Sequence, residues 1–338
     1  MSKPVRIRDV ASAAGFSVGA VSRALKGQPG IGDKPRQHII QLAQAMGYDF
    51  SRLHSSKIQR VLFILHHQHN ISMSLSFYTP LLMEVEAACR EKNIALSFLA
   101  LGPTDEVEKL VRQHNPDGLL IVGYLEPEIL LALRGLQLPL ALIDLMSPDL
   151  NSVNPDNLHG GYLATRHLID LGRRNIAFLA SSLAHYSIQQ RERGYRQALY
   201  EAEVLTPPEY EAIAPIHLPA EQGLETATLQ LISLPRPPDG LFAYNDAAAL
   251  IALRTCKRAG LRVPDDIAII GFDDVDSAAL AEPPLSTVRV DRCQLGRRGL
   301  ELLLTDSQAE QQLIDVKLCV RASTAASCET NAKESVNE

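Results

Sequence analysis

The sequence predicts an α/β protein, with a small all-α headpiece at the front and a larger domain of two parallel α/β sheets behind it. Three observations lead to this prediction. The chain has 338 residues, more than one compact domain usually holds. Its first sixty residues carry three short helical patterns and an excess of positive charge. Beyond Val61, short apolar runs alternate with helical stretches, as they do in parallel sheets.

The charge is distributed unevenly along the chain. Residues 1–60 contain ten Lys or Arg and three Asp or Glu, a net charge of +7. Since the whole chain carries −6, the remaining residues carry −13. A basic segment on an acidic body suggests that the segment meets a polyanion such as DNA. The alternative is an ordinary basic surface without a partner.

The composition argues against several classes of protein. The five cysteines are scattered and show no C-x-x-C spacing, which disfavours a disulfide framework or a zinc site. The N-terminus has no apolar segment of a secretory signal, and no apolar run is long enough to span a bilayer. We therefore expect a cytoplasmic protein with no membrane partner.

The headpiece contains short helical patterns, with residues that commonly start or end helices at their boundaries. Apolar residues of segment 7–14 recur at i, i+3, i+4 and i+7, and Gly15 follows where a left-handed residue ends a helix. Ser17 is placed to cap a second helix, which buries Val21 and its neighbours. A third helix is expected from near Lys34 to Gly47.

Two short helices joined by a tight glycine-containing turn predict a helix-turn-helix. In that motif the first residues of the second helix reach base edges in the major groove. Arg23 could read a guanine or hold a phosphate, and other basic side chains could contact phosphates. The alternative is a three-helix bundle without a DNA role. The candidate contacts from the pattern and its charges are Arg6, Arg8, Ser17, Val18, Gly19, Ser22, Arg23 and Lys26.

The body is expected to form two sheets covered on both faces. Strands are predicted at 61–65, 94–100, 118–122, 138–143, 175–180, 240–243 and 267–270. In open α/β sheets, ligands bind beyond the carboxyl ends of the strands. Asp144, Asn245 and Asp273 follow such strands, and Arg191 lies in a stretch predicted to open a helix. Carboxylates, an amide and a guanidinium suit a polyhydroxylated ligand, although each Asp alone could be a helix cap.

The headpiece residues 7–25 resemble the lactose/galactose repressor (LacI/GalR) family, whose pattern is D-V-A-x-x-A-G-V-S-x-x-T-V-S-R-x-L. The resemblance extends along nearly the whole chain. Segment 167–178 resembles H-L-I-x-L-G-H-x-x-I-A-F, and segment 320–324 matches the final V-R-x-S-T. The family resemblance implies a two-lobed, periplasmic-binding-protein-like body with a ligand site between the lobes.

The resemblance also implies roles for particular residues. Val18, Gly19 and Arg23 stand where family members contact bases, although Gly19 offers no side chain. The family hinge pattern Y-x-P-N-x-x-A-R-x-L is altered here, with Phe50 in place of proline, so Leu53 is the candidate minor-groove wedge. The alternative for this segment is a flexible linker.

The implied effector-binding residues come from both lobes. They include Phe77 and Tyr78, which match an aromatic pair near the site, and Val122, which replaces a polar residue and argues for an unusual ligand. His67 is a candidate for hydrogen bonding to the ligand, in preference to a metal site with its neighbouring histidines. The full set is His67, Phe77, Tyr78, Val122, Asp144, Arg191, Asn245 and Asp273.

These observations define a domain plan and a function. We expect a headpiece at 1–48, a linker at 49–60, an effector-binding and dimerisation domain at 61–328 and a disordered tail at 329–338. Lobe 1 is expected at 61–156 and 291–318, and lobe 2 at 157–290 and 319–328. The prediction is a homodimeric repressor of operator DNA, controlled by a small metabolite, with no cofactor and no bound metal. No catalytic motif is present. The alternative is a solute-binding protein with the same body.

Overall fold

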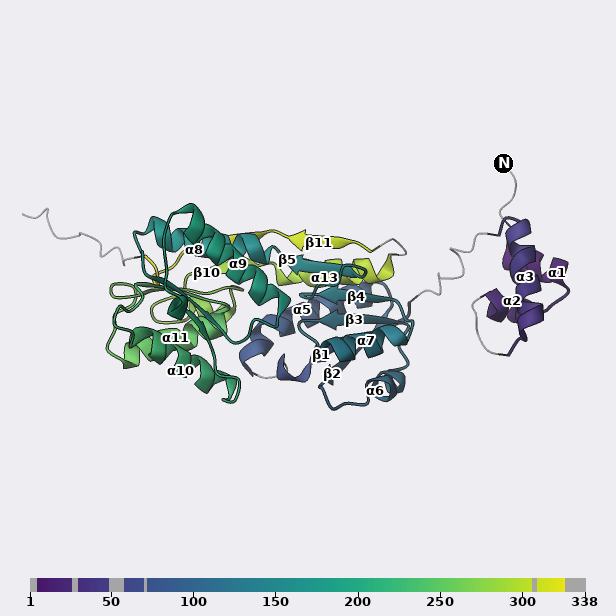
Figure 1. Cartoon of the computed structure of the whole chain (residues 1–338). Helices are drawn as coiled ribbons and strands as arrows, with labels where there is room; N and C mark the ends of the chain where they lie inside the picture. The colour runs from purple at the N-terminus through teal and green to yellow at the C-terminus, as the bar shows by residue number, and fades with distance from the viewer. Residues whose placement is uncertain (1–4, 26–29, 49–57, 70–71, 306–308, 326–338) are drawn as a thin grey trace, which may run out of the picture. The chain divides into compact units, whose positions relative to one another are not determined.

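The computed structural model describes residues 5–25, 30–48, 58–69, 72–305 and 309–325. The chain divides into two compact units, Met1–Gln59 and Arg60–Glu338. Each unit has its own apolar side chains in its core (Figure 1).

The first unit, the headpiece, is a bundle of three helices. They are α1 (Ile7–Ala14), α2 (Val18–Leu25) and α3 (Asp33–Ala45), and each contacts the other two. Small and branched apolar side chains let these short helices pack closely. The buried core consists of Val10, Ala11, Val21, Ala24, Ile39, Ala43 and Tyr48.

The ends of the headpiece helices follow the predicted capping pattern. Gly15 has φ +70°, and its N–H bonds the Ala11 carbonyl to end α1. The Ser17 hydroxyl accepts from the Ala20 N–H at 3.2 Å and so caps α2. Arg6 has no capping hydroxyl, but its backbone N–H donates to the Asp9 carboxylate at 2.7 Å. A three-residue turn therefore joins α1 and α2 as a helix-turn-helix.

The second unit contains two lobes. Lobe 1 has a six-stranded parallel sheet in the order β11-β5-β4-β3-β1-β2. Helices α6 and α7 cover one face, and α5 and α13 cover the other (Figure 1). The elements are β1 (Arg60–His66), η1 (His67–His69), α5 (Ser72–Glu91), β2 (Ala95–Leu101), α6 (Val107–His114), β3 (Gly118–Val122), α7 (Pro127–Gly135), β4 (Leu140–Ile143), β5 (Asn151–Pro155), α13 (Arg292–Leu304) and β11 (Gln311–Ile314).

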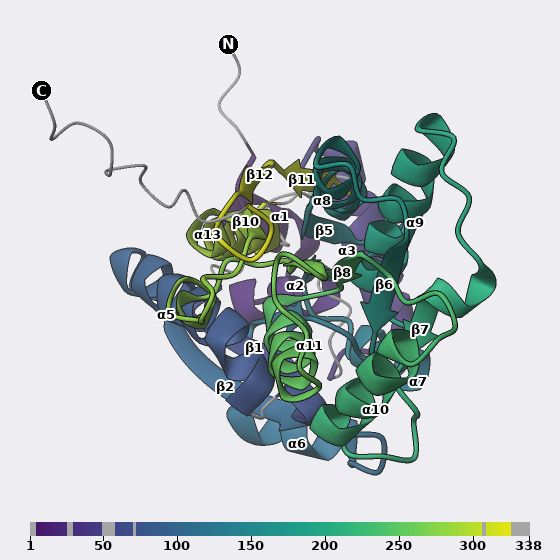
Figure 2. The ribbon, with the colours of Figure 1, turned by 90° about the vertical axis from the view of Figure 1, so that its left-hand side faces the viewer.

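Lobe 2 has a four-stranded parallel sheet in the order β7-β6-β8-β9. Helices α10 and α11 cover one face, and α8 and α9 lie on the other (Figure 2). Every residue of β6 and β8 is buried, as expected for strands covered on both sides. The elements are α8 (Asn157–Asp170), β6 (Ile176–Ala180), α9 (Tyr186–Glu201), η2 (Pro208–Tyr210), β7 (Glu211–Ile213), α10 (Ala220–Ile232), β8 (Gly240–Ala243), α11 (Asp246–Arg258), β9 (Ala268–Ile270) and α12 (Asp276–Ala279).

An antiparallel ribbon of β10 (Thr287–Val290) and β12 (Val316–Cys319) lies against α8 and belongs with lobe 2. The chain passes between the lobes at residues 155–157, 290–292 and 314–316. The last crossing comes a few residues before the boundary expected at 318. The predicted α/β fold with two lobes and two parallel sheets is confirmed. None of the helices in the described part of the chain has the length and apolar character needed to cross a bilayer.

Candidate functional sites

The exposed face of the headpiece carries the predicted DNA contacts. Arg6 and Arg8 lie exposed at the start of α1, and Arg23 is exposed on α2. Val18 exposes 43% of its surface although it is apolar, and it begins α2. Ser22 is half-buried. The exposed small residues Val18 and Gly19 thus lie in the first turn of α2, the part of a helix-turn-helix that faces DNA, and the exposed Arg23 lies in its last turn.

Two further positions on this face have specific roles. The Ser17 hydroxyl oxygen accepts a hydrogen bond as the cap of α2. Its O–H remains able to donate a hydrogen bond to a phosphate. Gly19 is exposed, and a Cβ added there would meet no atom within 4 Å. The predicted contacts Lys26 and Leu53 lie outside the described residues.

The second candidate site lies between the lobes and is organised around Arg191. This residue is buried in α9, which begins at Tyr186, so the prediction that Arg191 opens the helix was wrong. The backbones of helices α9 and α8 are in direct contact where the two helices cross. A Cβ on Gly161 would lie 2.2 Å from the Arg191 carbonyl oxygen, and one on Gly194 would lie 2.1 Å from the Leu158 carbonyl oxygen. Only glycine permits this close approach of the two helix backbones at the turn of α9 that carries Arg191.

Each of the three nitrogens of the Arg191 guanidinium has an oxygen partner in the protein. Its Nε donates to Asn157 Oδ1 at 2.9 Å, and Nη1 donates to the Tyr244 carbonyl at 2.6 Å. Nη2 lies 3.4 Å from Asp273 Oδ1. The guanidinium carbon also lies 3.7 Å from the centre of the Phe272 ring, a cation–π contact. These contacts hold the cation in one position.

Lobe 1 contributes a carboxylate to the same cluster. Asp144 directly follows β4 with φ +57°, and the Tyr78 hydroxyl donates to its Oδ2 at 3.3 Å. Asp273 follows β9 with φ +110°, a backbone conformation that residues other than glycine rarely adopt. Asp144 Oδ1 and Asp273 Oδ1 are both buried, and neither accepts a well-formed hydrogen bond from the described residues. Lobe 1 thus offers an Asp144 oxygen without a donor among the described residues, and lobe 2 offers an Asp273 oxygen whose contact with Arg191 is long, at 3.4 Å.

Burial shifts the pKa values of these carboxyl groups. It raises the pKa of Asp144 to about 6, although Arg191 and the Tyr78 hydroxyl oppose the shift. It raises the pKa of Asp273 to about 7, with Arg191 opposing and Asp144 adding to the rise. The influence of Asp144 on Asp273 places the two carboxyls in one electrostatic environment, although they belong to different lobes. A ligand that donates hydrogen bonds would favour their ionised forms.

The remaining predicted effector residues are Phe77, Asn245, His67 and Val122, and they differ in burial and in their contacts. Phe77 is buried, and its ring lies 5.0 Å edge-on from that of Tyr78. Asn245 caps α11, where its Oδ1 accepts from the Ala248 N–H at 2.9 Å. By contrast, His67 is exposed and packs over Gly102, and no contact joins it to Arg191 among the described residues. Val122 is buried at the end of β3.

Sequence reasoning missed several aromatic residues at the lobe interface. The rings of Tyr124, from lobe 1, and His185, from lobe 2, lie 4.5 Å apart. Burial, His66 and Arg191 lower the pKa of His185 to about 4. His66, the last residue of β1, is buried, and its Nε2 lies 3.0 Å from Glu126 Oε1, whereas the predicted ligand contact His67 is exposed. Every residue of β1 from Val61 to His66 is buried, so no alternation along the strand could have indicated the burial of His66.

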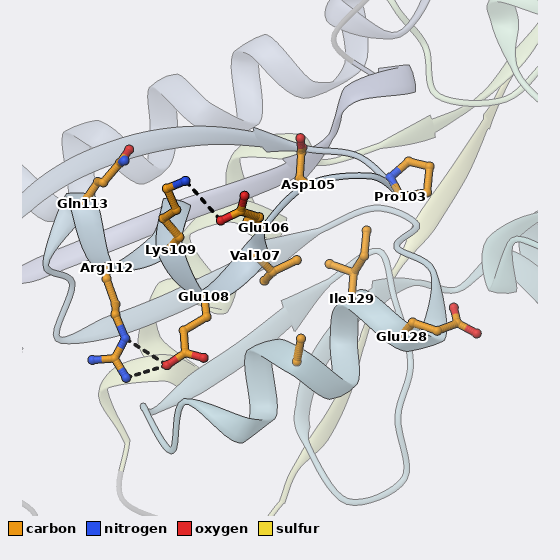
Figure 3. Close-up of a pocket in the computed structure, with 11 residues that line it drawn as sticks. Pro103, Asp105, Glu106, Val107, Glu108, Lys109, Arg112, Gln113, Glu128 and Ile129 are labelled. Carbon is orange, nitrogen blue, oxygen red and sulfur yellow. Dashed lines mark hydrogen bonds and ion pairs between the residues drawn. The ribbon is translucent and has the colours of Figure 1, made fainter.

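A surface groove with a volume of about 860 Å³ lies elsewhere, between α6 and α7 (Figure 3). It contains none of the predicted effector residues. Its charges are largely paired along α6, where Lys109 contacts Glu106 at 3.1 Å and Arg112 contacts Glu108 at 2.6 Å. Within the described residues, no group of three or more His, Cys, Asp or Glu side chains could hold a metal ion.

Comparison with known proteins agrees with this architecture. Residues 165–324 match the model of the periplasmic binding protein-like domain. The chain is 32% identical over 294 residues to the transcriptional regulator DegA of Bacillus subtilis (strain 168), covering 83% of this chain and 85% of DegA. The chain belongs to the LacI/GalR family of transcriptional regulators. As a LacI/GalR regulator it is a transcription factor and not an enzyme.

Other LacI/GalR proteins are similar over nearly the full length. The repressor CytR of Escherichia coli (strain K12) is 29% identical over 340 residues, covering 95% of this chain and 96% of CytR. The solved complex of the transcriptional regulator CelR with cellobiose has a TM-score of 0.71 and 25% identity, covering 94% of this chain and 99% of CelR. Both similarities include the headpiece and both lobes.

Proposed function

We propose that this chain is a repressor whose headpiece binds operator DNA and whose lobes bind a small polyhydroxylated metabolite, a sugar or a sugar derivative. The observation that carries the proposal is a pair of buried carboxylate oxygens near Arg191: Asp144 Oδ1 has no hydrogen-bond donor among the described residues, and Asp273 Oδ1 has only the long 3.4 Å contact with Arg191 Nη2. A buried oxygen without a donor costs free energy until one is supplied. Sugar hydroxyls both donate and accept, so they suit carboxylates and a guanidinium at once. The cellobiose bound by CelR supports a carbohydrate ligand.

The two carboxylates suggest how the ligand controls the lobes. A ligand that forms hydrogen bonds with Asp144 of lobe 1 and Asp273 of lobe 2 stabilises the lobe arrangement in which it can contact both residues at once. The ligand can shift the equilibrium between lobe arrangements only by its difference in affinity for them. In allosteric proteins such coupling is typically about 1–3 kcal/mol. The paired headpieces would then change their affinity for DNA by that amount.

In this proposal the DNA contacts have separate tasks. Val18 and Gly19 at the start of α2 and Arg23 in its last turn face the bases, and Arg6 and Arg8 hold phosphates. Ser17, Ser22, Lys26 and, as a minor-groove wedge, Leu53 complete the interface by resemblance to the family. The chain acts as a homodimer, as the family resemblance implies, and places two headpieces on successive half-sites. The division into headpiece, linker and effector domain remains part of this proposal.

The DNA proposal predicts a tight and sequence-specific complex that depends on Arg23. Selection from a random duplex pool with the full chain, at about 0.15 M salt, should enrich a near-palindromic sequence. On that sequence, Arg23→Ala should weaken binding about 10- to 100-fold in a gel-shift titration, because a base contact is lost. Arg112→Ala removes an exposed positive charge from α6 and serves as the matched control, with affinity expected to stay within about twofold.

The alternative function, solute binding alone, gives a different result. A thermal-shift screen of sugars, sugar acids, sugar phosphates and nucleosides would still find a ligand, but the selection would enrich no sequence over bulk DNA. Equal binding of the Arg23→Ala and Arg112→Ala variants to the selected duplex would remove α2 from the interface.

A further inference from the structure

Arg292 is the first residue of α13 and lies at a crossing between the lobes. It follows Asp291, whose carboxylate caps α13 by accepting from the Gln294 N–H at 2.8 Å. Its guanidinium donates to two backbone carbonyls that are far apart in the sequence. Nη1 bonds the Ser76 carbonyl at 2.9 Å, in α5 of lobe 1. Nη2 bonds the Asp274 carbonyl at 3.3 Å, in lobe 2.

A proline in α5 explains why the Ser76 carbonyl needs a hydrogen-bond donor from outside the helix. In an α-helix this carbonyl would accept from the N–H four residues later. That residue is Pro80, which lies inside α5 and has no N–H. The proline therefore leaves the Ser76 carbonyl without its helical partner, and Arg292 supplies the missing donor from another helix. The next residues of α5 are Phe77 and Tyr78, and Tyr78 donates to Asp144.

The second carbonyl belongs to the strained segment that presents Asp273. Asp273 and Asp274 have φ of +110° and +55°, respectively, which non-glycine residues rarely adopt. Within lobe 2 this segment is held by its backbone, since Asp273 N–H donates to the Val288 carbonyl at 2.7 Å. The Asp274 carboxylate accepts from Arg289 and Arg321, each at 2.6 Å. Arg292 adds a contact to the same segment from a helix that packs on lobe 1.

We propose that Arg292 is a positioning residue that ties the Asp273–Asp274 segment of lobe 2 to the proline-interrupted turn of α5 in lobe 1. The guanidinium is a rigid planar fork, so its two donors cannot move independently. A displacement of Asp273 is therefore passed to the turn that carries Tyr78. The positive charge of Arg292 also acts on the Asp273 carboxyl and opposes the rise of its pKa. The role of the tie in the effector response rests on the proposed function, whereas the tie itself can be tested without an effector.

The test measures hydrogen exchange by mass spectrometry in the full chain, in segments 272–276 and 77–81. Arg292→Lys keeps the charge but replaces the fork with one ammonium group, which cannot serve both carbonyls in the same way. We expect exchange to accelerate about tenfold in both segments, the effect of losing about one hydrogen bond in each. Arg297→Lys is the matched control. Arg297 lies on the same helix and contacts Glu84 and Glu91 of α5, so both segments should stay within about twofold.

A second variant separates the tie from a general packing role of Arg292. Pro80→Ala restores an N–H that can bond the Ser76 carbonyl within α5. In the Pro80→Ala background, Arg292→Lys should still accelerate exchange in 272–276 but should leave 77–81 within about twofold. An unchanged segment 272–276 in Arg292→Lys would overturn the tie, as would an equal effect on 77–81 in both backgrounds. Neither result would bear on operator or metabolite binding, which the selection and the thermal-shift screen test.

Discussion

The headpiece and the lobe interface use charged side chains in opposite ways. Among its described residues, the headpiece buries only apolar side chains and Tyr48, and it leaves Arg6, Arg8 and Arg23 exposed. The lobe interface buries its charges instead, with Arg191 at 4% exposure and Asp273 at 6%. In the proposed function, arginine therefore serves both an exposed surface that meets a large polyanion and a buried site that encloses a small ligand.

This difference determines how each region responds to change. Exposed charges act through water, so salt screens them and the loss of one changes affinity by a modest amount. Buried charges depend on their partners, because an uncompensated charge in the interior is costly. We expect substitutions at the interface to change folding stability strongly, and substitutions on the headpiece surface to change mainly DNA binding.

The largest expected effect follows from removing the cation at the interface. Arg191→Met keeps much of the side-chain volume but leaves Asp144 and Asp273 buried without their positive partner. We expect a loss of about 3–5 kcal/mol in the free energy of unfolding at pH 8, measured by urea unfolding with circular dichroism. Arg193→Met, two residues later and exposed on α9, should change it by less than about 0.5 kcal/mol. Similar losses in the two variants would contradict the contrast between buried and exposed charge.

A smaller effect concerns pH. The pKa of Asp273 is raised to about 7, so the folded chain holds a proton that the unfolded chain releases near pH 4. This contribution to stability is present at low pH and is lost as the pH rises through about 7. Between pH 5 and pH 8 the wild-type chain should lose about 1–3 kcal/mol more stability than Asp273→Asn.

The pH comparison has a control on the same segment. Asp276 is exposed at the start of α12, and Asp276→Asn should retain the wild-type dependence on pH. Urea unfolding at both pH values gives the four free energies needed for each variant pair. A wild-type dependence that persists in Asp273→Asn would place the titrating group elsewhere.

The smallest expected effect compares two glycines of the headpiece, at both of which an added Cβ would meet no atom within 4 Å. Gly19 lies in α2, so Gly19→Ala should stabilise the headpiece by about 0.5–1 kcal/mol through helix propensity. Gly15 has φ +70°, so Gly15→Ala should destabilise it by about 1 kcal/mol. Hydrogen exchange of the Val10 and Val21 amides in the full chain measures both. Shifts of the same sign would show that backbone conformation does not decide the outcome.

Much of the fold was predictable from local patterns. The strands at 118–122 and 240–243 and the helix at 7–14 have the predicted bounds, because apolar runs and capping residues define them. The strands β5 and β11 were missed, since Asn151–Pro155 and Gln311–Ile314 contain few apolar residues. These two segments become strands by pairing with each other and, through β5, with β4 at the edge of the sheet. Their structure depends on neighbours and not on their own composition.

The sequence by itself determined the helix-turn-helix, the alternation of strands and helices, and the family, because each is carried by residues close together in the chain. Only the tertiary structure decided which side chains share an environment. Arg191 meets Asn157 and Tyr244 across separations of 34 and 53 residues, and Arg292 reaches Ser76 across 216. Long-range contacts of this kind depend on how sheets and helices pack. Several of them involve backbone carbonyls, and because every residue has one, the residue type does not indicate which carbonyl will be used.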